Sequence, residues 1–137
     1  REGRGMARTT KSSVIHLDTH IVCWLYEGRT ELLTAAAMRA IEDGLLQVSP
    51  MVQLELTYLH ETGRINRGGH AVLEALAKDI GLSVADVSFA QVMKTAETLT
   101  WTRDPFDRMI VAHCTVANAM LVSKDQLIQK HFAKVIW

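Results

Sequence analysis

Short apolar runs alternate with longer amphipathic segments through most of this chain, and that alternation constrains the fold more than any other feature. The runs predict strands at residues 14–17, 45–49, 82–88, 119–123 and 134–137, of which 82–88 is a strand or an extended segment. Patterns of helical period fill the gaps, at residues 19–28, 30–44, 50–63, 70–81, 89–99, 105–118 and 125–132. Runs that are almost continuously apolar are typical of parallel strands covered on both faces. The order therefore predicts one α/β domain with a parallel sheet and helices on both faces.

Several helix ends are marked by residues that favour them. Thr19 is an expected cap of the first helix, and Gly44 is placed to end the second. In the segment WTRDPFDRMIVAHC, Asp104 is a favoured N-cap, which puts Pro105 at the first helical position and Asp107 in the first turn. The same two acids lie on one face of that helix, three residues apart. Capping alone explains them unless other acids lie nearby.

The first 13 residues, REGRGMARTTKSS, differ in composition from the rest of the chain. We expect them to be a flexible or tag-derived leader, and we assign the folded domain to residues 14–137. The leader holds four basic residues and one acid, so eleven basic and fourteen acidic residues remain in the domain. A slightly acidic domain disfavours simple coating of nucleic acid. Two cysteines without metal-site spacing, and no apolar run near the ~20 residues of a membrane span, fit a reduced cytoplasmic protein.

Acidic residues fall where the predicted strands end or the following helices begin. Asp18 follows the first strand, and Asp125 follows the fourth one after a lysine. Because ligands of open α/β sheets bind outside the carboxyl ends of the strands, we expect both acids at one edge. Asp107, with Asp104 nearby, begins the helix that leads into the fourth strand. Glu55 lies among Val52, Leu56 and Leu59 in a helix, so it either reaches solvent, pairs with an arginine or faces this edge.

A cluster of carboxylates at one edge needs a counter-charge, because each carboxylate raises the pKa of its neighbours. Arginine side chains would neutralise one or two of the acids, whereas a hard divalent cation would neutralise the whole cluster. Mg²⁺, with Mn²⁺ as the alternative, prefers such all-oxygen ligands, and its usual role in enzymes is phosphate chemistry. No Cys or His spacing typical of a zinc site is present in the sequence.

Four motifs in order resemble the PIN domain, and more narrowly the VapC-type toxins of bacterial toxin–antitoxin pairs. They are LDTH, SPMVQLELTYLHETGRI, RDPFDRMIVAHC and LVSKDQLIQ. The resemblance covers residues 14–137. It implies a three-layer α/β/α sandwich around a parallel sheet, and a Mg²⁺-dependent endoribonuclease in which metal-activated water hydrolyses RNA phosphodiesters. It also implies a VapB-like antitoxin as partner and a homodimer.

The resemblance also implies roles for individual residues. It assigns catalysis to Asp18, Glu55, Asp107 and Asp125, the metal to Asp18, Asp107, Asp125 and Asp104, and supporting roles to Thr19 and Ser123. Beside these acids, Arg103, Arg108 and Lys124 are expected either to grip RNA phosphates or to balance the carboxylates. His20, two residues after the first acid, is close enough in sequence to approach the site, but a structural role is the more common one for such a histidine.

Two other functions stay open at this point. One is a non-catalytic module that binds RNA or protein on a PIN-like fold. The other is a different Mg²⁺-dependent phosphohydrolase, such as a haloacid-dehalogenase-like phosphatase. That class needs Asp-x-Asp after the first strand, whereas this chain has Asp18-Thr19-His20, so the second acid is missing.

Overall fold

The computed structural model describes residues 13–137. Its sheet contains β1 (Val14–Leu17), β2 (Leu45–Val48), β3 (Ser83–Val84), β4 (Met120–Val122) and β5 (Val135–Ile136). All strands are parallel, in the order β3-β2-β1-β4-β5. β1 is central, and its Ile15, His16 and Leu17 are each at most 3% exposed. The apolar run that predicted this strand therefore lies where both faces of the sheet are covered.

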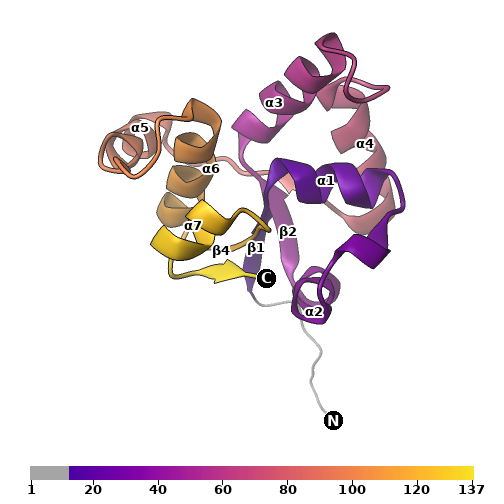
Figure 1. Ribbon diagram of the computed structural model, residues 1–137, viewed down its shortest axis with the longest axis horizontal. Coiled ribbons are helices and arrows are strands. Elements are labelled where there is room, and N and C mark those ends of the chain that lie inside the picture. Colours follow the sequence, from indigo (N-terminus) through magenta and orange to yellow (C-terminus); the bar gives the residue numbers. More distant parts are fainter. Residues whose placement is uncertain (1–12) are drawn as a thin grey trace.

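Seven α-helices and one short 3₁₀ helix are described. They are α1 (Thr19–Tyr26), η1 (Thr30–Leu32), α2 (Ala35–Asp43), α3 (Pro50–Glu61), α4 (Gly69–Ile80), α5 (Phe89–Glu97), α6 (Pro105–Val116) and α7 (Gln126–His131). Figure 1 shows α1 to α4 gathered on one side of the sheet and α5 to α7 on the other. The predicted three-layer α/β/α sandwich is confirmed. No helix among residues 13–137 is long and apolar enough to cross a bilayer.

The order in which the chain forms the strands explains why α1 to α4 and α5 to α7 lie on opposite faces of the sheet. It also creates a crevice at one edge of the sheet. From β1 the chain moves outward to β2 and then β3, whereas after β3 it returns to the other side of β1, to β4 and then β5. Right-handed crossovers in opposite directions place their helices on opposite faces. The point where the order reverses lies between β1 and β4, and ligands of open α/β sheets bind outside the carboxyl ends of the strands there.

Two local predictions differ from the structure. The segment 30–44, predicted as one helix, is divided into η1 and α2, because the Thr34 side chain accepts a hydrogen bond from Ala37 N and caps a new helix at Ala35. Gly44 ends α2 as expected. Thr19 is the first residue of α1 rather than its cap, because Asp18 accepts from Thr19 N and takes the capping position. The leader predicted at residues 1–13 lies, except for Ser13, outside the described residues.

A close approach of two helices fixes the position of α3, which carries Glu55. A Cβ atom at Gly69, the first residue of α4, would collide with the Gln53 carbonyl and would crowd the Thr57 hydroxyl. Gly69 N instead donates to Thr57 Oγ1 at 3.1 Å. At the other end, Gly81 ends α4 with φ at 72°, a backbone conformation that favours glycine. The α3–α4 pair therefore packs tightly beside the sheet.

Candidate active site

Asp18 lies at the crevice between β1 and β4 and is 4% exposed. One carboxylate oxygen accepts from Thr19 N at 2.8 Å, and the other accepts from Ser123 Oγ at 2.6 Å. The Ser123 hydroxyl also accepts a hydrogen bond from Asp125 N at 3.1 Å. A single buried hydroxyl thus joins the loop after β1 to the loop after β4. The expected convergence of the first and fourth strand ends is present in the structure.

Glu55 reaches the same edge from α3. Thr19 Oγ1 donates to Glu55 Oε1 at 2.5 Å, and the glutamate is half-buried. Among residues 13–137, no lysine or arginine forms an ion pair with this carboxylate. Of the three interpretations left open for Glu55, the structure therefore supports the one in which it faces the strand ends. Thr19 holds it beside Asp18.

Asp104 and Asp107 begin α6 as their spacing predicts. Asp104 is the N-cap, with its Oδ1 accepting from Phe106 N at 2.8 Å and from Asp107 N at 3.2 Å. Pro105 follows at the first helical position. Asp104 is exposed, whereas Asp107 is half-buried. The cap therefore fixes the first turn, from which Asp107 extends.

Asp125 caps α7 by accepting from Ile128 N at 2.9 Å, and its neighbour in the site is His20. Lys124 N donates to His20 Nε2 at 3.1 Å, so a neutral His20 ring carries its proton on Nδ1. That nitrogen lies 3.7 Å from Asp18 Oδ2. His20 therefore belongs to the cluster, a placement that the sequence left as the less common alternative. Its position two residues after Asp18 was the only available signal.

The electrostatics show how closely the acids gather. Burial, followed by the charges of Asp104, Asp18, Asp125 and Glu55, raises the pKa of Asp107 to about 7. Burial also raises the pKa of Glu55, with smaller contributions from Asp18 and Asp104, against the hydrogen bond from Thr19 that lowers it. Such mutual repulsion requires the carboxylates to lie near one another in a partly desolvated site.

The residues present fit a hard divalent cation. Every acid in the cluster offers oxygen donors, and no lysine or arginine within residues 13–137 pairs with any of them. In the same range, no three His, Cys, Asp or Glu side chains are arranged as a ready-made metal site. Asp18, Asp107 and Asp125 would hold the ion, with Glu55 or Asp104 close by. In the described geometry these acids share one edge of the sheet but do not form a ready-made metal site.

The cationic residues predicted to grip RNA have other contacts. Arg108 donates from Nε to Thr102 O at 2.8 Å and from Nη1 to Ala96 O at 3.4 Å. Arg103 donates to Thr100 O at 2.9 Å and is exposed. Lys124 lies at the rim of the site, with its Nζ 5.6 Å from the centre of the Trp24 ring. Lys124 lines a cavity together with Asp125, whereas the hydrogen bonds of the two arginines hold the loop that precedes α6.

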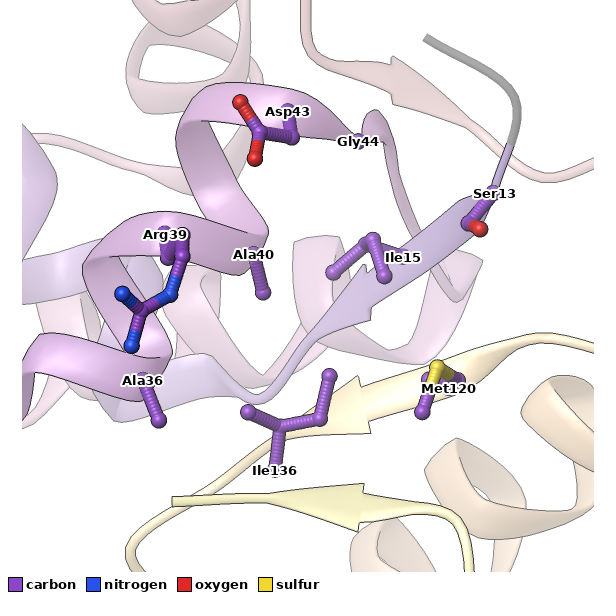
Figure 2. Close-up of a pocket in the computed structure, with 9 residues that line it drawn as sticks. All are labelled: Ser13, Ile15, Ala36, Arg39, Ala40, Asp43, Gly44, Met120 and Ile136. Atoms are coloured by element: carbon purple, nitrogen blue, oxygen red, sulfur yellow. The ribbon is translucent and has the colours of Figure 1, made fainter.

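A cavity of about 340 Å³ at the other end of the strands carries none of the predicted residues. Figure 2 shows its lining, which comes from α2, from the starts of β1 and β4, and from β5: Ser13, Ile15, Ala36, Arg39, Ala40, Asp43, Gly44, Met120 and Ile136. Among residues 13–137, Arg39 and Asp43 are the only charged side chains that line it. The cavity therefore lacks the concentration of acids found at the carboxyl edge.

An open parallel sheet with carboxylates at its switch point defines an α/β protein whose candidate site lies at the carboxyl edge of the strands. The chain belongs to the PIN domain family, whose model matches residues 15–134. The resemblance predicted from the four motifs is thereby confirmed. None of the curated proteins matches the chain.

Three similar solved structures are VapBC complexes. The chain aligns with VapBC2 from Rickettsia felis bound to a promoter DNA fragment, at 17% identity and a TM-score of 0.62, covering 89% of this chain and 96% of the other. DNA-bound VapBC from Salmonella typhimurium aligns at 15% identity and a TM-score of 0.61, covering 90% and 96%. VapBC-1 from nontypeable Haemophilus influenzae aligns at 19% identity and a TM-score of 0.54, covering 85% and 93%. At these identities the matches show a shared fold.

Replacing Asp107 by asparagine should stabilise the protein at neutral pH when divalent ions are chelated. A folded-state pKa near 7 against an ordinary value of 3.8 means that the folded chain binds the proton more tightly. The stability due to this group is therefore fully present below pH ~3.8 and is lost as pH rises to ~7. After allowance for solvent around a half-buried side chain, we expect Asp107→Asn to gain about 1–2 kcal/mol at pH 7.5.

Urea unfolding in EDTA at pH 7.5 and pH 4 measures this gain. The exposed Asp86, replaced in the same way, is the matched control. A stability difference between Asp107→Asn and the wild type that does not change with pH would show that Asp107 carries no raised pKa.

Proposed function

We propose that the protein is a divalent-metal-dependent endoribonuclease of the toxin class found in VapBC pairs. The proposal rests on one arrangement, in which the Ser123 hydroxyl ties the Asp18 loop to the Asp125 loop at the switch point of a PIN domain. Glu55 and Asp107 complete the acid cluster from α3 and α6. Four carboxylates from different parts of the chain thus lie close together at the edge of the sheet where, under this proposal, a phosphodiester would bind.

The cation explains how an acidic site accepts a negatively charged substrate. Mg²⁺ or Mn²⁺ would supply Lewis-acid stabilisation of phosphoryl oxygens and would make a water molecule a stronger nucleophile at neutral pH. The protein supplies the oriented acids. Asp18 is fixed by two hydrogen bonds, Thr19 orients Glu55, and the capped first turn of α6 holds Asp107. Hydrolysis is expected to leave 5′-phosphate and 3′-hydroxyl ends.

We also propose a VapB-like antitoxin as the partner of this chain. The support is that three structures of the same fold are VapBC complexes. Exposed apolar side chains Leu54 and Tyr58 on α3, and Phe89 and Met93 on α5, offer surface for an antitoxin or for a second copy in a homodimer. A segment of the antitoxin covering the acid cluster would block RNA.

Cleavage of a total RNA pool with end mapping tests the activity. We expect cleavage in Mg²⁺, none in excess EDTA, and recovery when Mg²⁺ or Mn²⁺ is restored, because the acids need their counter-ion. Products should accept ligation at the 5′-phosphate without prior phosphorylation. Cleavage that persists in EDTA would overturn the metal-dependent mechanism. Calorimetric Mg²⁺ binding without any cleavage would instead favour the non-catalytic module.

A further inference from the structure

A cavity of about 460 Å³ opens directly beside the acid cluster, and the proposed function does not account for it. Its lining comes from α1, from the loop after β4, from α7 and from the residue after β5: His20, Trp24, Lys124, Asp125, Gln126, Gln129 and Trp137. Asp125 belongs both to this lining and to the acid cluster. The cavity is therefore continuous with the proposed catalytic site.

The walls of this cavity are aromatic. The centres of the Trp24 and Trp137 rings lie 6.3 Å apart, and their planes are inclined by 44°. The edge of His20 meets Trp24 with 5.2 Å between ring centres. Both tryptophans are half-buried, so part of each remains accessible. Flat apolar surfaces held in fixed positions suit a planar ring that stacks against them.

The rim of the cavity is polar and, on one side, positively charged. Lys124 is exposed, and its Nζ lies over the Trp24 ring, 5.6 Å from the ring centre. A base that stacks on this face of Trp24 would displace the ammonium toward the rim, where a phosphate can meet it. Gln129 Nε2 donates to Lys124 O at 2.9 Å, and this hydrogen bond holds the side-chain amide of Gln129 in place. Gln126 is exposed beside it. Aromatic walls, amide groups at the rim and one cation match the three parts of a nucleotide, namely its base face, its base edge and its phosphate.

We propose that this cavity is a nucleobase subsite. In it, a base next to the scissile phosphate stacks on Trp24, and the Lys124 ammonium neutralises a neighbouring phosphate. The assignment rests on the proposed function. Continuity with Asp125 favours a nucleotide over an aromatic side chain of a partner protein, because a strand of RNA that presents one phosphate to the acids must place its next base close by. The cation at the rim complements the RNA backbone and gives no advantage to an uncharged side chain.

Binding of short single-stranded RNA in Ca²⁺ tests the subsite, because this hard cation supplies the counter-charge that the acids need before RNA can approach. Gel analysis of the same RNA confirms that it stays intact during the measurement. Fluorescence anisotropy of labelled octamers of A, C, G and U should give the affinity of the wild type, and tryptophan fluorescence should be quenched on binding. Trp24→Leu should weaken binding about tenfold, since stacking of one base on an aromatic ring contributes about 1–3 kcal/mol. Trp24→Phe should retain most of the affinity. Lys124→Gln should weaken binding and make it less dependent on salt.

Trp101→Leu is the matched control, because Trp101 stacks on His131, with 5.1 Å between ring centres, and does not line the cavity. Its RNA affinity should equal that of the wild type, and circular dichroism should show that each variant is folded. A folded Trp24→Leu variant with wild-type affinity for all four octamers would overturn the subsite. So would a loss confined to binding of a partner protein, because the cavity would then receive a protein side chain.

The outcomes separate this proposal from the proposed function. Trp24-dependent RNA binding in Ca²⁺ without cleavage in Mg²⁺ would support the subsite and contradict the endoribonuclease. If the wild type cleaves RNA in Mg²⁺ and Trp24→Leu cleaves it at the same rate and with the same base preference, the endoribonuclease is supported and the subsite is contradicted.

Discussion

Asp18→Asn should lower the rate of RNA cleavage by about 10²-fold or more while leaving the protein folded. Loss of a residue that merely supports a metal ligand typically costs 10–100-fold in affinity or activity, and a direct ligand should cost at least as much. The fold should survive because asparagine is as good an N-cap as aspartate. Its side-chain oxygen can accept from Thr19 N, and its amide can donate to Ser123 Oγ, which now lies 2.6 Å from the carboxylate.

Two further variants make this result specific. Asp79→Asn, at an exposed position in α4, should cleave at the wild-type rate, which shows that losing one surface carboxylate does not itself lower activity. Loss of cleavage in Asp18→Asn prepared in the same way excludes contaminating ribonuclease as the source of activity. Asp18→Ala should lose both activity and about 1 kcal/mol or more of stability, because it removes the cap and leaves the Ser123 hydroxyl without its acceptor. Undiminished cleavage by Asp18→Asn would contradict the assignment of this acid.

His16→Leu should make the fold less sensitive to acid between pH 6.5 and 4, whatever Asp107 and His113 contribute in the same range. His16 is fully buried in β1, and neither ring nitrogen has a hydrogen-bond partner. Burial, with a smaller effect of nearby His113, lowers its pKa to about 4. Gln47 on β2 opposes this shift without forming a hydrogen bond of standard geometry. Leucine fills a similar space and cannot be protonated.

The pH dependence follows from the two protonation equilibria. Above pH ~6.5 His16 is neutral in both states and has no effect on the pH dependence. As pH falls toward 4, the unfolded chain binds a proton that the folded chain excludes, so stability is lost, by about 3 kcal/mol in total. Urea unfolding at intervals across this range should show the stability of His16→Leu rising relative to the wild type as pH falls, whereas a control with the exposed His70 replaced by leucine should follow the wild type. Parallel pH profiles of wild type and His16→Leu would show that His16 does not resist protonation.

The strands and most helices could be predicted because their signals are local. Val14–Leu17 is an apolar run ended by an aspartate, and Pro105 and Gly81 mark helix ends through backbone chemistry that needs no distant partner. The division of segment 30–44 was missed because a helical period continues across Thr34. Only the hydrogen bond from Ala37 N shows that a new helix begins there.

In the candidate site, too, some features could be predicted from the sequence and others could not. The convergence of Asp18 and Asp125 could be predicted, because strand ends in a parallel sheet share an edge. The cavity beside them could not be, since it depends on Trp137 lying next to Trp24, a contact between the last residue and the first helix. Nor could the sequence show that Arg108 is engaged with the carbonyls of Thr102 and Ala96. Such contacts follow from packing, which carries no local signature.

The bond between Ser123 and Asp18 joins residues 105 positions apart, and it has a consequence for synthesis. A growing polypeptide emerges from the ribosome with its first strand long before β4, and pairing of β1 with β4 waits for the whole α5–α6 segment. Until that strand docks, Asp125 and Ser123 are not beside Asp18. A nascent chain that has not yet formed β4 therefore cannot carry the assembled acid cluster, and under the proposed function it could not cleave the RNA of the ribosome that produces it before that strand docks.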